Sequence, residues 1–224
     1  TRKNQDIPGT IKIFGNGGSM LPLANATYYP NDLTENAIQI IGESDGVFNN
    51  EDYILFYAQG VDTWSQESQT NINLYDSKSY YYVTIQESNG KRIQNLTQPS
   101  GNSTLNLSTF DDHQFHEKDL TNIGRVGRKW FGEGFEINQE QEFSFNFPNI
   151  DTSTPIKLSI NTASSAITTT TFKVLANGQE VGTMSFPPLA QNSSILFYES
   201  SLPTNTTFPS SENVKIKLSY NNNG

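Results

Sequence analysis

The stretch that decides the fold class is ESDGVFNNEDYILFYA, residues 43–58 of the 224-residue chain. Its first part, residues 43–52, is rich in Asp, Asn and Gly, whose short side chains bond to their own backbone in turns. Its second part, residues 53–58, is aromatic and aliphatic, a composition typical of strands. The stretch therefore predicts a turn that leads into a β-strand, and we expect that strand to be buried on both faces.

Further strands are predicted by apolar residues that recur at every second position. This alternation is clearest over residues 143–147, 156–160 and 214–220. It indicates strands with one buried face, because successive side chains of a strand point to opposite sides. Helical periodicity is nearly absent, and a short helix is expected only within residues 111–123. The sequence therefore predicts an all-β protein.

Two Asn-Gly dipeptides, Asn89–Gly90 and Asn177–Gly178, each lie between strand-like segments. This dipeptide supplies the positive φ angles of a tight turn, so both are predicted to form β-hairpins. Beyond Asn138 the chain becomes a series of strand-like segments with Thr-rich and Pro-containing connections. We therefore expect two β-rich modules, residues 1–135 and 136–224, the second a jelly roll or related β-sandwich, with a disordered tail at residues 221–224.

The composition excludes several classes of function. A formal net charge of −9 and a pI near 4.7 argue against a nucleic-acid partner, which requires a concentrated basic face. No apolar run approaches the length of a transmembrane segment, and the first four residues do not resemble a signal peptide. The chain has no cysteine, so a disulfide framework and a cysteine nucleophile are both excluded for it.

The acidic turn and strand belong to a set of sequence blocks that resembles the N-terminal region of the type IX secretion sortases of Bacteroidetes, members of the gingipain family of cysteine peptidases. Further blocks occur in similar order and spacing. They are Ile7-Pro-Gly9, Ile13-Phe-Gly-Asn-Gly-Gly18, Asp32-Leu-Thr-Glu-Asn-Ala37, Tyr80-Tyr-Tyr-Val83, His116-Glu-Lys-Asp-Leu120 and Gly127-Arg-Lys-Trp-Phe-Gly-Glu133. The resemblance is specific over residues 7–135 and weaker beyond, where Asn177-Gly-Gln179 is the main shared signal.

This resemblance implies that the chain is the non-catalytic N-terminal scaffold of a longer parent, with a cleaved signal and a catalytic cysteine-peptidase domain elsewhere in that parent. The parent would cleave C-terminal signal domains from cargo and attach the cargo to a lipopolysaccharide acceptor. It would act in the periplasm or at the cell surface, associated with the outer membrane. The expected partners are the catalytic domain of the same parent chain, type IX secretion components and cargo proteins.

Two alternatives stay open. The first is an inhibitory pro-region that inserts Arg128 or Lys129 into the specificity pocket of a gingipain-like peptidase. The second is a glycan-binding surface module, in which Trp64, Trp130 and tyrosines stack on sugar rings. The basic cluster of Arg125, Arg128 and Lys129 is interpreted as a solvated turn or as a local contact surface.

The candidate site residues are predicted to form domain interfaces rather than a catalytic centre. Tyr80, Tyr81 and Tyr82 cannot all point inward from one strand, so aromatic side chains must also face solvent or another domain. The candidates are Tyr57, Trp64, Tyr81, His116, Asp119, Arg128 and Trp130.

No catalytic residue, metal or cofactor is predicted. Asp45, Asn49 and Asp52 offer oxygens suited to calcium, but bonding of the turn to its own backbone is the preferred interpretation. His113 and His116 lack the spacing of a zinc motif, and no nucleophile-elbow sequence accompanies either histidine.

Overall fold

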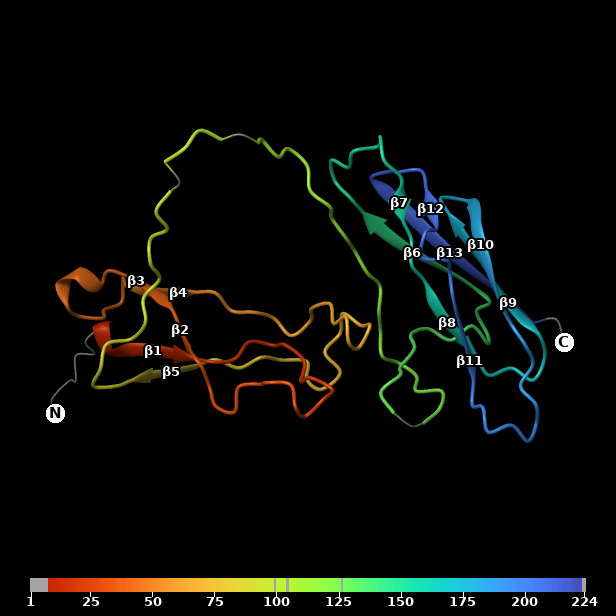
Figure 1. Cartoon of the computed structure of the whole chain (residues 1–224), viewed down its shortest axis with the longest axis horizontal. Helices are drawn as coiled ribbons and strands as arrows, with labels where there is room; N and C mark the ends of the chain where they lie inside the picture. The colour runs from red at the N-terminus through yellow and green to blue at the C-terminus, as the bar shows by residue number, and fades with distance from the viewer. Residues whose placement is uncertain (1–7, 99, 104, 126, 223–224) are drawn as a thin grey trace. The chain divides into compact units, whose positions relative to one another are not determined.

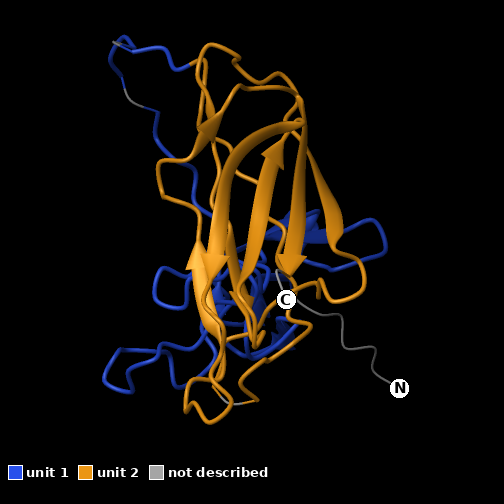
Figure 2. Ribbon diagram, turned by 90° about the vertical axis from the view of Figure 1, so that its right-hand side faces the viewer, with its two compact units in different colours: residues 1–107 blue, residues 108–224 orange. Residues whose placement is uncertain are grey.

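The computed structural model describes residues 8–98, 100–103, 105–125 and 127–222, which form two compact units (Figures 1 and 2). Unit 1 comprises residues 1–107 and unit 2 comprises residues 108–224. This division lies before the predicted boundary at 135/136. The difference arises because side chains of the intervening segment pack onto unit 2: the ring centroid of Phe135 lies 4.9 Å from that of Phe172.

The structure confirms the all-β prediction, because both units consist of antiparallel strands with long connections. Unit 1 contains the short 3₁₀ turns η1 (Pro8–Thr10) and η2 (Glu43–Asp45) and the strands β1 (Ile11–Phe14), β2 (Glu35–Asn36), β3 (Ile38–Ile41), β4 (Tyr53–Phe56) and β5 (Tyr82–Ile85). One sheet has the order β2-β1-β5, and β3 pairs separately with β4. The core of unit 1 is formed by four buried isoleucines, Ile11, Ile13, Ile38 and Ile40.

Strand β4 shows where the prediction from the deciding stretch is right and where it is wrong. Residues 43–52 turn and residues 53–56 form a strand, as predicted. Only Ile54 and Phe56 pack against the core, however, while Tyr53 and Leu55 are exposed. The strand is therefore half-buried, because β3 and β4 pair as a two-stranded sheet with one face on the core.

Unit 2 contains the strands β6 (Glu140–Asn146), β7 (Ile156–Lys157), β8 (Asn161–Ser164), β9 (Thr170–Ala176), β10 (Gln179–Phe186), β11 (Tyr198–Ser201), β12 (Thr207–Phe208) and β13 (Asn213–Asn222). The first strand pairs with the last, β7 with β12, β8 with β11, and β9 with β10. This nested pairing is that of a long hairpin folded over on itself, the pattern expected of a jelly-roll-related module. Strand β9 also pairs with β13, giving a sheet of order β10-β9-β13-β6.

The core of unit 2 lies between that four-stranded sheet and the shorter strand pairs. Buried Phe172, Val174 and Phe186 come from the sheet, while Leu202 and Phe208 come from the segment containing β11 and β12. This core explains the alternation seen in the sequence, since β9 and β13 bury every second residue. Outward-facing positions of the sheet include Lys173, Lys215 and Lys217, each of which forms an ion pair with a Glu side chain.

The two predicted hairpins have different outcomes. Asn177 and Gly178 have φ angles of 48° and 83°, and they connect β9 to β10 as predicted. Asn89–Gly90 does not form a hairpin: the Gly90 amide donates to the Gly9 carbonyl at 2.9 Å, and the chain continues to an isolated parallel bridge between Arg92 and Ile38. The prediction was wrong because a contact distant in sequence replaced the local turn.

The predicted helix within residues 111–123 is also absent from the structure. The described part of this segment is irregular, and the side chain of Gln114 bonds to the carbonyl of Asn146 instead. Asn221 and Asn222 belong to β13, contrary to the predicted disorder of the tail, while Ile7 and residues 223–224 lie outside the described residues. No helix in the described part of the chain has both the length and the apolar composition of a transmembrane segment.

Candidate interaction surfaces

The predicted interface residues are divided between the units. Tyr57, Trp64 and Tyr81 belong to unit 1, whereas His116, Asp119, Arg128 and Trp130 belong to unit 2. Each group is therefore described within its own unit.

Tyr57 continues an exposed apolar row on the outer side of β4. Tyr53 and Leu55 occupy the alternate positions of the strand that point away from the core, and Tyr57 follows at the same spacing with 82% of its surface exposed. Gln39 and Ile41 lie opposite Leu55 and Tyr53 on β3. We call Tyr53, Leu55 and Tyr57 the β4 row. A row of large apolar side chains in solvent is a feature of contact surfaces.

Tyr81 has a structural role within unit 1. Its hydroxyl accepts a hydrogen bond from the backbone N–H of Gln59 at 2.8 Å and lies 3.3 Å from the backbone carbonyl oxygen of the same residue. Its ring packs edge-on against Phe56, with 5.3 Å between the ring centroids. Tyr80 and Tyr82 are exposed, which confirms the expectation that the three tyrosines cannot all point inward.

A shallow depression of about 250 Å³ lies between Tyr57 and Tyr81. Its remaining lining is mostly small and polar, formed by Gly15, Asn16, Gly17, Pro30, Thr34, Asn36 and Gln59. Gly15 has no room for a side chain, because a Cβ there would lie 2.5 Å from the Tyr81 ring. Trp64 does not line this depression; it is half-exposed, and its indole nitrogen lies 3.4 Å from the Gln66 side-chain oxygen.

The acidic turn before β4 uses its side chains to hold its own backbone. The Asp45 carboxylate accepts a hydrogen bond from the backbone N–H of Val47 at 3.0 Å, and the Asp52 carboxylate accepts one from the backbone N–H of Asn49 at 2.8 Å. Asn49 in turn accepts from the Glu51 amide at 2.9 Å. These are the contacts that the backbone interpretation of the turn predicts.

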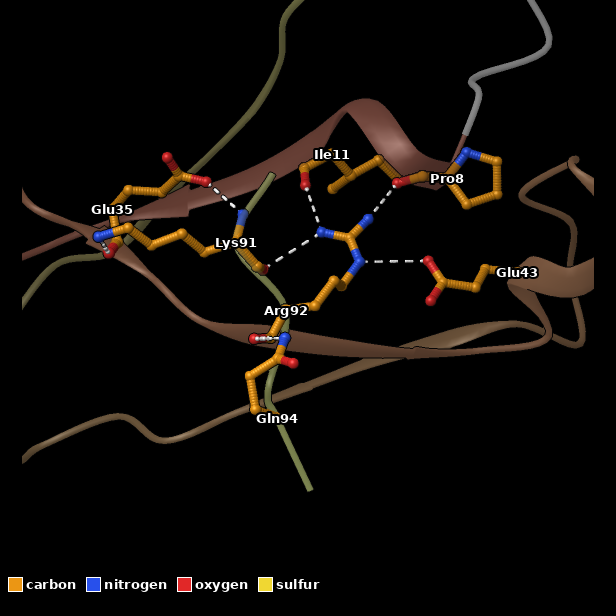
Figure 3. A network of polar contacts seen from close by, with 7 residues as sticks. All are labelled: Pro8, Ile11, Glu35, Glu43, Lys91, Arg92 and Gln94. Atoms are coloured by element: carbon orange, nitrogen blue, oxygen red, sulfur yellow. Dashed lines mark hydrogen bonds and ion pairs between the residues drawn. The ribbon is translucent and has the colours of Figure 1, made fainter. Parts of the chain in front are cut away.

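Arg92 holds unit 1 together and was not identified from the sequence. Its guanidinium lies among the carbonyl oxygens of Pro8, Ile11 and Lys91, at 2.8, 3.4 and 3.3 Å, and Nε lies 3.2 Å from the Glu43 carboxylate (Figure 3). Five N–H donors in a fixed plane suit such a cluster of oxygens. A lone Arg carries no local sequence signal, because its acceptors come from segments far apart in the chain.

In unit 2, His116 and Lys118 share one carboxylate oxygen of Glu133. Both nitrogens lie 2.9 Å from Glu133 Oε1. The His116 ring packs against the Phe143 ring at a tilt of 48°, with 4.5 Å between centroids. Burial alone would raise the pKa of Glu133, but the hydrogen bonds from Lys118 and His116 outweigh it and lower that pKa. The histidine thus fastens the segment before β6 to the sheet.

Asp119 lies beside this ion-pair cluster. Burial, together with the nearby charge of Glu117, raises the pKa of its carboxyl above the ordinary value. His113 is exposed, and no group of three or more His, Cys, Asp or Glu side chains placed to hold a metal occurs among the described residues.

Arg128 and Trp130 lie on one loop of unit 2. Antiparallel bonds between Thr121 and Phe131 close the loop at its base, with N···O distances of 2.9 and 2.8 Å. Lys129 forms an ion pair with Glu199 at 2.9 Å, whereas Arg128 is exposed and has no ion pair among the described residues. Trp130 lines a depression of about 510 Å³ with Asn122, Arg125 and Gly127. We call residues 122–130 the basic loop.

No protein-family model matches the chain. No curated protein matches it either. A solved structure, that of dimeric latent PorU from Porphyromonas gingivalis, is similar to it with a TM-score of 0.66 and 20% sequence identity. The similarity covers 95% of this chain and 20% of the PorU chain. At this identity the likeness shows a shared fold, and the chain spans about a fifth of the length of the protein it matches.

Proposed function

We propose that this chain is the non-catalytic supporting region of a sortase-like parent protein, in which the two β units position a separate cysteine-peptidase region. The observation that carries the proposal is the fold likeness to PorU, which extends over 95% of this chain and only 20% of the longer protein. The sequence blocks point to the same family independently. Because the chain has no cysteine, the thiolate of such a peptidase would belong to another region.

In this proposal the parent removes C-terminal signal domains from type IX secretion cargo and attaches the cargo to the cell surface. The chain itself contributes binding and orientation. It would act in the periplasm or at the cell surface, in contact with the peptidase region of its own parent and with secretion components. The β4 row supports this role, because three large apolar side chains in solvent suit a lasting protein contact.

The adjoining gene sequence provides the first experiment. We expect the reading frame to continue beyond Gly224 into a region that contains a Cys and His pair. A natural translation product that stops near Gly224 would exclude the proposal.

The second experiment measures association between this chain and the remainder of its parent, expressed as separate polypeptides. Co-purification is expected, and replacement of Leu55 and Tyr57 by Ser should weaken it. Tyr28→Ser is a matched control, since Tyr28 is 87% exposed and lies outside the β4 row. If the two polypeptides neither associate nor change each other's solubility or activity, the supporting role is wrong.

An inhibitory pro-region is the second candidate, and the exposed position of Arg128 favours it. Gingipain-type preference for Arg or Lys would allow an unpaired side chain to enter the peptidase pocket. Arg128 fits this better than Lys129, which is held by Glu199. Under this alternative, Arg128→Ala abolishes inhibition of the separate catalytic region, whereas Lys129→Ala weakens that inhibition only in part. Unchanged inhibition by a variant with both substitutions excludes the pro-region alternative.

A further inference from the structure

We propose that the depression in the basic loop binds a sugar that carries a carboxylate, with the Trp130 indole against the ring and the Arg125 guanidinium on the carboxylate. The proposal concerns unit 2 alone. It therefore does not depend on the existence of a catalytic parent.

Hydrogen bonds join described residues of the loop to one another; Val126 lies outside the described residues. The bridge between Thr121 and Phe131 fixes its base, and the Asn122 side-chain amide donates to the Gly127 carbonyl across it at 3.1 Å. Arg125 and Gly127 have φ angles of 51° and 70°. A non-glycine residue in this left-handed region is uncommon, and such residues cluster at ligand-binding sites.

Two further contacts fix the loop to β11 and its flank. Lys129 pairs with Glu199 at 2.9 Å, and Phe131 packs edge-on against Phe197 with 5.6 Å between centroids. Trp130 lies between these two anchored residues. Because neighbouring side chains of an extended segment point to opposite sides, the indole is directed away from β11 and lines the depression.

The charge of the loop contrasts with that of the chain. Residues 121–132 contain Arg125, Arg128 and Lys129 and no acidic residue, although the whole chain carries a net charge of −9. Glu133, the next carboxylate along the chain, is held by His116 and Lys118. The Arg125 guanidinium has no ion pair among the described residues, so it is available to an anion.

The lining of the depression favours an acidic sugar over other anionic ligands. The depression has a volume of about 510 Å³ and is wide open to solvent, so a ligand would lie on its surface. The electron-rich face of an indole attracts the positively polarised C–H groups of a sugar ring, and a guanidinium binds a carboxylate through two parallel hydrogen bonds.

Other polymers fit this lining less well. A peptide would need pockets for apolar side chains or an open strand edge, and the lining has one apolar side chain, Trp130. A nucleic acid would need more cations along its backbone than three on one loop.

Trigalacturonic acid is a suitable probe, and the full 224-residue chain carrying Trp64→Phe is a suitable protein. Because the chain has two tryptophans, this substitution leaves Trp130 as the only indole, and its fluorescence reports on the site. We expect a saturable change in fluorescence with trigalacturonic acid and none with neutral maltotriose. Shifts of the Gly127 amide in NMR spectra provide a second measurement that does not require the indole.

Arg125→Asn is the decisive variant, since Asn tolerates a left-handed φ and keeps the loop while removing the guanidinium. It should weaken binding about tenfold or more, as should Trp130→Ala. Arg128→Asn is the matched control. It also removes one positive charge from the loop, but Arg128 does not line the depression, so binding should change less than about twofold. Circular dichroism verifies that each variant folds.

Three results overturn the proposal. The first is the absence of any saturable signal by both fluorescence and NMR. The second is equal weakening by Arg125→Asn and Arg128→Asn, which shows general attraction of anions to the loop. The third is binding of maltotriose or of a hexaglutamate peptide as tight as that of trigalacturonic acid, which removes the specificity for an acidic sugar.

Discussion

The phenolic oxygen of Tyr81 lies 2.8 Å from the backbone nitrogen of Gln59, so one side chain joins the segment before β5 to the segment after β4. The same hydroxyl reaches the Gln59 carbonyl at 3.3 Å. The Gln59 carbonyl also accepts from the Ser79 hydroxyl at 3.0 Å, so both backbone groups of Gln59 are satisfied without a partner strand. A tyrosine proposed from the sequence as an interface residue thus has a contact inside its own unit, while its neighbours Tyr80 and Tyr82 present their rings to solvent.

Tyr81→Phe should lower the free energy of unfolding of unit 1 by about 1 kcal/mol, because it removes the hydrogen bonds and keeps the ring on Phe56. Urea unfolding, followed by the NMR amide signals of the unit 1 core, measures the change. Tyr80→Phe is the control, since that ring is largely exposed, and it should have almost no effect. Equal effects of the two substitutions would contradict the role assigned to the Tyr81 hydroxyl.

Gly42 has a φ of 100° and faces Asp52 across the acidic turn. A Cβ at Gly42 would lie 1.7 Å from Asp52 Oδ1, so the carboxylate that accepts from the Asn49 amide would have to move. Gly42→Ala should therefore destabilise unit 1 by about 2–3 kcal/mol, through the left-handed backbone and the clash together. The same NMR-monitored unfolding measures the loss.

Gly46→Ala separates the two causes of that loss. Gly46 also has a positive φ, 80°, but nothing lies within 4 Å of a Cβ built there. Its substitution should cost only the backbone contribution, about 1 kcal/mol. If Gly42→Ala cost no more than Gly46→Ala, the clash with Asp52 would have no energetic consequence.

The sequence predicted the parts of the fold that depend on neighbours along the chain. The turn at residues 43–52, the strand that follows it and the hairpin at Asn177–Gly178 are all local, and all are present. The alternation in β13 was readable because one face of a single long strand is buried.

The features that were missed depend on contacts distant in sequence. Asn89–Gly90 carries the same turn signal as Asn177–Gly178, but the bond from Gly90 to Gly9 and the bridge from Arg92 to Ile38 prevent a hairpin. The role of Arg92 was invisible for the same reason. Among the candidate site residues, the sequence identified aromatic and basic types, but only the structure shows that Trp130 shares a depression with Arg125 while Lys129 is already paired.

Arg92→Lys tests whether the planar donor cluster is needed. Lysine keeps the positive charge but cannot reach the carbonyls of Pro8, Ile11 and Lys91 together, so unit 1 should lose about 2 kcal/mol of stability. Glu43→Gln is the comparison, because it removes the partly exposed ion pair and leaves the carbonyl contacts; it should cost about 0.5 kcal/mol or less. A larger loss from Glu43→Gln than from Arg92→Lys would show that the ion pair, and not the carbonyl cluster, holds the segments.

The outer face of the unit 2 sheet carries diagonal ion pairs between β13 and β6. Lys217 lies opposite Glu142 in the register, yet its Nζ lies 2.7 Å from Glu140, while Lys215 contacts Glu142 at 2.8 Å. Hydrogen bonds from Lys217 and Ser219 lower the pKa of Glu140 below its ordinary value of 4.5. On β10, the hydrogen bond and charge of Lys173 lower the pKa of Glu180 in the same way.

The direction of these shifts determines how the face responds to acid. A carboxyl whose pKa is lower in the folded than in the unfolded protein stabilises the fold above the unfolded pKa, and that contribution disappears as the pH falls through the folded pKa. Lys217→Gln should raise the pKa of Glu140 toward 4.5 and leave that of Glu180 unchanged, because Glu180 is paired with Lys173. NMR titration of the two side-chain carboxyl carbons measures both values. Should Glu180 shift as far as Glu140, a long-range field would be responsible and not the Lys217 contact.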